Sequence, residues 1–123
     1  MNLNTQILLP KNVDLNSISE AIDKLYGVGL ISFKLPPDLP EEQKYKVCEE
    51  RLEKLNDLVA HIIMKNRHIF QKKQPKTILA SGIYLACRKN GIKITYNTLY
   101  FELGVTGASL RRTLKSLRLA RVI

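Results

Sequence analysis

The chain has 123 residues, of which 45% are hydrophobic and 25% charged, and this composition is typical of one globular domain rather than of a disordered chain. No apolar run approaches the ~20 residues of a membrane span, and the first residues lack the pattern of a secretory signal peptide. We therefore expect a soluble intracellular protein without a membrane partner, located in the cytoplasm or nucleoid, or in the nucleus if the source is a eukaryote.

The net charge of +9 is distributed unevenly along the chain. Residues 1–57 contain 7 Lys or Arg and 10 Asp or Glu, whereas residues 58–123 contain 13 Lys or Arg and a single acidic residue, Glu102. The cations of the second half therefore have few carboxylates to neutralise them. Such a separation of charge indicates a polyanionic partner, although a merely solvated basic surface has the same composition.

The first helix is predicted over residues 17–27, where apolar residues recur every three or four positions. Ser17 and Glu20 have the spacing of a capping box, in which each side chain satisfies a free backbone N–H of the first turn. Gly27 ends the helix, and the Pro-Pro pair that follows excludes helix from the next segment.

A second, long helix is predicted over residues 38–66, with Asp38 as an acceptor at the cap and Pro40 in the first turn. The apolar positions of this segment recur at spacings of three and four residues: Tyr45, Cys48, Leu52, Leu55, Val59 and Ile62. We expect this stripe to lie across the core of a helical bundle, because about three heptads are few for a coiled coil. Cys48, and Cys87 further along, are expected to be small buried hydrophobes rather than reactive thiols.

Residues 67–74 are predicted to form a polar, basic loop that leads into a third helix over residues 75–90. Small residues at positions 80–82 allow a neighbouring helix to approach this helix closely. Gly91 provides the C-terminal stop.

Residues 95–117 follow the pattern of helix, glycine turn and helix, with Gly104 at the turn and Thr95 and Thr106 as helix caps. No strand pattern is strong anywhere in the chain. The predicted fold is therefore all-α, and residues 1–123 form a single domain of five helices.

The last of these helices has two distinct faces. Leu110, Leu114 and Leu117 form an apolar stripe, while the opposite face carries small residues and cations: Ala108, Ser109, Arg111, Arg112 and Lys115. This is the layout of a helix-turn-helix unit, in which the second helix enters the major groove of DNA and arginine can bind guanine O6 and N7 together. Many helical bundles have similar corners, so the pattern alone is not specific.

Two motifs resemble the cyclin-like repeat of the transcription factor B family, the general initiation factors shared by archaea and eukaryotes. The first is the central helix of the repeat, read here as Ile83-Tyr84-Leu85-Ala86-Cys87-Arg88. The second is the entry into the recognition helix, read here as Gly104-Val105-Thr106-Gly107-Ala108-Ser109-Leu110-Arg111-Arg112. The resemblance extends from about residue 75 to residue 117 and implies a five-helix cyclin-like bundle that ends in a helix-turn-helix.

The resemblance and the charge together predict a set of residues that contact double-stranded DNA. They are Thr106, Ala108, Ser109, Arg111, Arg112 and Lys115 in the last helix, and Lys72, Lys73, Lys76, Lys93 and Thr95 before it. For the three lysines near position 75, a solvated surface is an equally good interpretation. Members of the family carry a zinc ribbon and two tandem repeats, whereas this chain has no CxxC pair and room for one repeat, so recruitment of polymerase through a ribbon is not expected.

Catalysis finds no support in the sequence. The chain has no glycine-rich phosphate loop, no nucleophile with a matching base, and no substrate or cofactor motif. His61 and His68 lack partners at the spacing of metal ligands. We therefore expect neither an enzyme nor a metal or cofactor site.

Two functions remain open at this point. The chain is either a DNA-binding transcription regulator that places its last helix in the major groove, or a protein-interaction module that docks on the transcription machinery through its helical grooves. The basic second half favours the first function, and the missing ribbon and second repeat favour the alternative.

Overall fold

The computed structural model describes residues 9, 10 and 12–119, and within this part of the chain it contains helices and no strands. The helices are α2 (Leu15–Gly27), α3 (Glu41–Lys65), α4 (Arg67–Phe70), α5 (Pro75–Lys89), α6 (Tyr96–Leu103) and α7 (Gly107–Leu119). The all-α prediction is confirmed.

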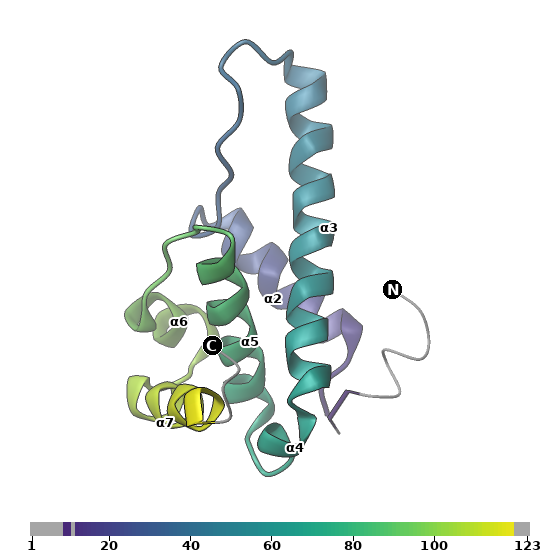
Figure 1. Cartoon of the computed structure of the whole chain (residues 1–123). Coiled ribbons are helices and arrows are strands. Elements are labelled where there is room, and N and C mark those ends of the chain that lie inside the picture. Colours follow the sequence, from purple (N-terminus) through teal and green to yellow (C-terminus); the bar gives the residue numbers. More distant parts are fainter. Residues whose placement is uncertain (1–8, 11, 120–123) are drawn as a thin grey trace.

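The bundle is organised around the contact between α3 and α5, with α2 packed on α3 and with α6 and α7 packed on the other side of α5 (Figure 1). Gly82 allows the close approach of α3 and α5. A Cβ atom at this position would lie 3.0 Å from Cγ1 of Ile63 and 3.1 Å from Cγ1 of Val59. Gly82 therefore has the packing role that the sequence predicted for the small residues of this helix.

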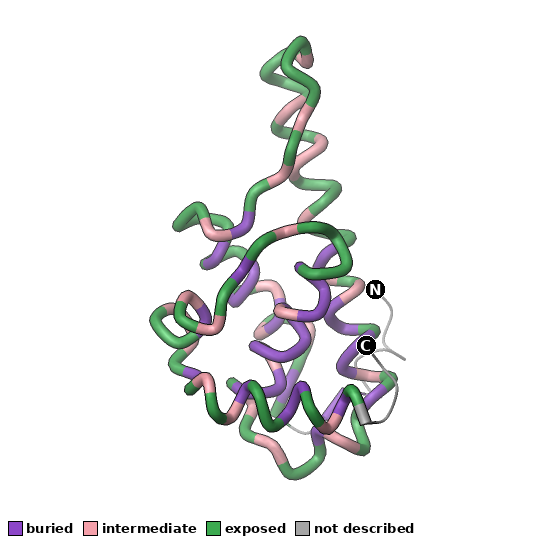
Figure 2. Tube along the Cα trace, turned by 60° about the vertical axis from the view of Figure 1, so that its left-hand side comes forward, coloured by how far each residue is buried: buried purple, intermediate pink, exposed green. Residues whose placement is uncertain are grey.

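The core consists of apolar side chains from every helix. Figure 2 shows that the buried residues gather where the helices meet, away from one projecting end of the molecule. The largest fully buried side chains are Ile18, Ile22, Leu25, Ile31, Val59, Ile63, Phe70, Ile78, Ile83, Leu99, Leu110 and Leu117. Each of them stabilises the fold by about 1.5–3 kcal/mol relative to an exposed side chain.

The projecting end is the first half of α3, and here the prediction of a fully packed stripe is wrong. Tyr45 is 69% exposed, and Cys48 and Leu52 are only half-buried, whereas the later members of the stripe are buried. The spacing of the stripe is correct, but the other helices lie mainly beside the second half of this helix (Figures 1 and 2). The segment before α3 is held to it by Arg51, whose Nη1 donates to the Lys34 carbonyl oxygen at 2.8 Å.

The start of α2 also differs from the prediction. The capping residue is Asp14, because its Oδ1 accepts a hydrogen bond from Ser17 N at 2.7 Å and its own N–H donates to Ser17 Oγ at 3.1 Å. The predicted capping box of Ser17 and Glu20 is therefore wrong. The capping box is formed by Asp14 at the cap and Ser17 at the third position of the helix. The backbone N–H of Ser17 lowers the pKa of Asp14 below its usual value.

Two further boundaries are corrected. Pro40, not Asp38, is the residue before α3, and no side chain caps this helix. Residues 67–74 are not simply a loop, since they contain the short helix α4, whose Phe70 is completely buried. One apolar side chain thus anchors the connection between α3 and α5. Gly91 has a φ of +70°, which fits its predicted place after α5.

Candidate nucleic-acid interface

The segment from Thr95 to α7 forms two short helices joined by a tight turn, as predicted. Thr95 Oγ1 accepts a hydrogen bond from Thr98 N at 3.3 Å, and Thr98 Oγ1 accepts from Thr95 N at 3.2 Å, which completes a capping box at the start of α6. Gly104 ends α6 with a φ of +73°, a left-handed conformation that favours glycine.

Thr106 caps α7, because its Oγ1 accepts a hydrogen bond from Ser109 N at 3.2 Å. Leu110, Leu114 and Leu117 are buried, so the predicted inward stripe of this helix is confirmed. These buried leucines fix the orientation of α7 on the bundle. The opposite face of the helix therefore points away from the bundle.

The outward face of α7 carries the residues that the sequence assigned to it. Ala108, Arg111, Arg112 and Lys115 are exposed. Ser109 is half-buried, and its Oγ accepts a hydrogen bond from the Thr106 hydroxyl at 3.0 Å, so both residues form the cap of the helix. Arg111 folds back along the helix, where its Nε donates to the Gly107 carbonyl oxygen at 3.3 Å.

The lysines outside α7 lie in different surroundings. Lys76 is beside the turn, since a Cβ atom on Gly104 would lie 3.6 Å from its Nζ. Lys72 is exposed and Lys73 is half-buried in the segment between α4 and α5. Lys93 is exposed two residues before the cap of α6, and it lines a hollow together with Lys34 and Arg51. Among these lysines, the structure thus places Lys76 directly against the turn between α6 and α7.

Within the described residues, the structure contains one ion pair, in which Lys44 Nζ lies 3.4 Å from Glu41 Oε1 on α3. The described cations of the second half of the chain therefore have no carboxylate within ion-pair distance. Lys24 is a cation that the sequence did not assign to this region. Its Nζ donates to the Glu102 carbonyl oxygen at 2.8 Å and so ties α2 to the end of α6 across 78 positions of the sequence.

Two tyrosines and two arginines meet where α5, α6 and α7 come together. The rings of Tyr84 and Tyr96 have centroids 5.2 Å apart, and the guanidinium carbon of Arg88 lies 5.7 Å from the Tyr84 ring centroid. Burial and the neighbouring Tyr84 hydroxyl raise the pKa of Tyr96, while the positive charges of Arg111 and Arg88 act in the opposite direction. We call these four side chains the tyrosine–arginine cluster.

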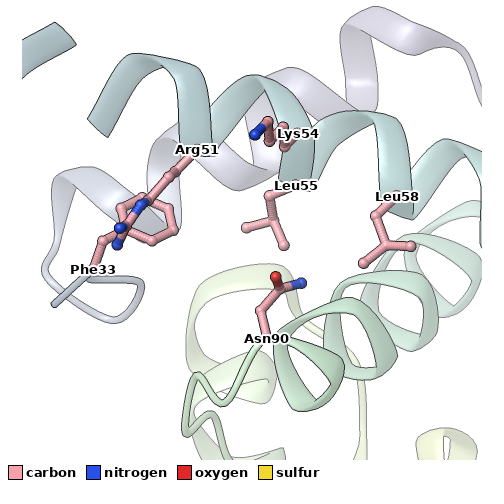
Figure 3. Close-up of a pocket in the computed structure, with 6 residues that line it drawn as sticks. All are labelled: Phe33, Arg51, Lys54, Leu55, Leu58 and Asn90. Carbon is pink, nitrogen blue, oxygen red and sulfur yellow. The ribbon is translucent and has the colours of Figure 1, made fainter. Parts of the chain in front are cut away.

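The structure also has a cleft between α3, the segment before α3 and the end of α5, with a volume of about 410 Å³ (Figure 3). The side chains that line it are Phe33, Arg51, Lys54, Leu55, Leu58 and Asn90. An adjoining hollow of about 760 Å³ adds Lys34 and Lys93 to this surface. No carboxylate lines either of these two hollows.

The described residues contain no group of three or more His, Cys, Asp or Glu side chains that could hold a metal ion. Cys87 is buried, and burial raises the pKa of its thiol to about 11, so the thiol is protonated at neutral pH. Cys48 is a free cysteine that is only half-buried. None of the helices described is both long and apolar enough to cross a membrane.

A comparison with protein families matches residues 53–120 to the model described as the transcription factor TFIIB repeat, and this range covers more than half of the 123 residues. The chain belongs to this family. The TFIIB repeat match runs from the second half of α3 to the end of α7, so α2 and the projecting half of α3 lie outside it. The resemblance read from the two motifs is confirmed. Comparisons with curated proteins and with solved structures found no match.

Proposed function

We propose that this TFIIB-repeat chain is a transcription regulator that binds double-stranded DNA directly, with α7 in the major groove. The observation that carries the proposal is the face of α7 formed by Arg111, Arg112 and Lys115, which is exposed and has no carboxylate partner among the described residues. The buried leucines on the opposite side hold this face outward. Guanidinium groups on such a helix can bind a guanine edge, while nearby lysines neutralise phosphates.

The proposal predicts salt-dependent binding to duplex DNA. A protein that makes 6–10 phosphate contacts loses roughly 10³–10⁵-fold in affinity between ~50 and ~200 mM salt, because bound counterions are released from the DNA. The measurement is a fluorescence-anisotropy titration of a random duplex over this salt range. Absence of binding at the lowest salt would overturn the proposal.

The alternative function is protein docking, and the projecting half of α3 favours it. Tyr45 is largely exposed there, and the cleft of Figure 3 lies along the same helix. An interaction module uses surfaces of this kind to bind another component of the transcription machinery.

Replacing Glu49, Glu50 and Glu53 together by Gln tests this alternative. All three side chains are exposed, so the free energy of unfolding should change by less than about 1 kcal/mol in urea denaturation. DNA affinity should rise slightly, because three negative charges are removed. If the variant instead loses binding to a purified initiation factor while its DNA affinity is unchanged, protein docking becomes the better interpretation.

A further inference from the structure

Three side chains of the tyrosine–arginine cluster, Tyr84, Arg88 and Tyr96, are not among the residues predicted to contact DNA. Tyr84 and Arg88 come from α5, Tyr96 comes from the first turn of α6, and Arg111 comes from α7. Gly107, the first residue of α7, packs close to Tyr96: a Cβ atom there would lie 3.9 Å from the Tyr96 Cβ. The cluster therefore borders the end of α7 that would enter the groove first.

The chemistry of the cluster suits an anion. Arg88 is exposed and lies against the face of Tyr84, which orients its guanidinium group without using its hydrogen-bond donors on a carboxylate. Glu102, the acidic residue of the basic half, lies on the last turn of α6, whereas Tyr96 lies on its first turn. Tyr96 is half-buried, and its phenol is a hydrogen-bond donor that can bind a phosphate oxygen.

Arg111 marks the border between this cluster and the outward face of α7. Its Nε is bound to the Gly107 carbonyl oxygen, which leaves the two terminal nitrogens of the guanidinium group available for another acceptor. Arg88, on the last turn of α5, lies beside Tyr96 because both side chains pack on the Tyr84 ring, and it lies outside the helix-turn-helix itself.

We propose that Arg88 and the Tyr96 hydroxyl form a binding site for one backbone phosphate of duplex DNA and thereby set the position of α7 in the groove. The inference rests on the proposed function. Tyr84 is a positioning residue in this site, because it contacts both the Arg88 guanidinium and the Tyr96 ring. Arg111 remains free to bind a base edge next to the anchored phosphate.

The first test measures the salt dependence of DNA binding for Arg88→Gln and Tyr96→Phe. Because Arg88→Gln no longer neutralises the phosphate, it should bind about tenfold more weakly and lower the slope of log affinity against log salt by about 0.9. Tyr96→Phe removes a neutral donor, so it should weaken binding about threefold and leave the slope unchanged. Lys46→Gln, which removes a charge at an exposed position on the projecting half of α3, is the matched control and should change neither quantity.

The second test identifies the phosphate. Neutral methylphosphonates are placed one at a time along a preferred duplex selected from random DNA. At one position the substitution should weaken binding of the wild type but leave that of Arg88→Gln unchanged, which a purely structural role for Arg88 would not produce. Thermal unfolding of each variant by circular dichroism verifies that the fold is retained.

The outcomes separate this inference from the proposed function. If the wild type does not bind duplex DNA at ~50 mM salt, the proposed function and this inference both fail. If the wild type binds with a steep salt slope but Arg88→Gln has the slope of Lys46→Gln, only the phosphate site fails. A single methylphosphonate position at which Arg88→Gln is insensitive supports the site.

Discussion

Ile83→Ala is expected to lower the free energy of unfolding by about 2–5 kcal/mol, the range measured when a buried aliphatic side chain is truncated. Ile83 is completely buried on α5, the helix that α3 and α7 both contact. The packed neighbours cannot collapse fully into the space left by the missing methyl and methylene groups, so a cavity adds to the cost of the reduced burial. Urea denaturation followed by circular dichroism measures the change.

Leu52→Ala provides the comparison within the same core. Leu52 is half-buried at the point where α3 begins to leave the body of the protein, so its truncation should cost less than about half of the Ile83 effect. Equal destabilisation by the two substitutions would contradict the placement of the core on the second half of α3.

Arg111→Ala should separate reading of bases from binding of the backbone. If the terminal nitrogens of Arg111 bind a guanine edge, the substitution costs about 1–3 kcal/mol on a preferred duplex and much less on a random one. The side chain is exposed, so the fold should not change. Anisotropy titrations on both duplexes measure the difference.

Replacing Lys72 and Lys73 by Ala is the counterpart of this experiment. Both lysines lie between α4 and α5 and outside α7, so we expect them to bind phosphate and not base edges. The double variant should weaken binding to both duplexes alike and reduce the salt slope by about one for each phosphate that is no longer neutralised. If Arg111→Ala also lowers the affinities for the preferred and the random duplex equally, α7 does not read sequence. The protein then binds DNA without sequence preference or recognises the shape of the DNA.

The pair of helices α6 and α7 could be predicted from the amino-acid sequence alone, because the interactions that define it are local. The caps at Thr95 and Thr106 involve partners three residues away, and Gly104 can adopt the left-handed conformation that ends α6 because glycine has no Cβ. The leucine stripe of α7 has helical spacing and requires only that some apolar surface covers it. Each of these features could be read from a short window of sequence.

The caps of α2 and α3 were harder to predict, since more than one residue near the start of each helix could act as the cap. Asp14 and Ser17 both offer an oxygen at the start of α2, and the earlier residue is the cap. At α3, Asp38 is a good acceptor, but Pro40 is the residue that precedes the helix. A local pattern predicts that a helix starts, while its first residue depends on how the preceding segment approaches the bundle.

Which part of a periodic pattern is buried could not be predicted from the sequence, because it depends on where the other helices pack. The stripe of α3 has the same spacing along its whole length, yet Tyr45 is exposed and Val59 is buried, because the bundle packs mainly beside the second half of the helix. The tyrosine–arginine cluster and the bond from Lys24 to Glu102 likewise join residues from separate helices. Interactions of this kind depend on how whole helices pack against one another, and spacing along the chain carries no information about them.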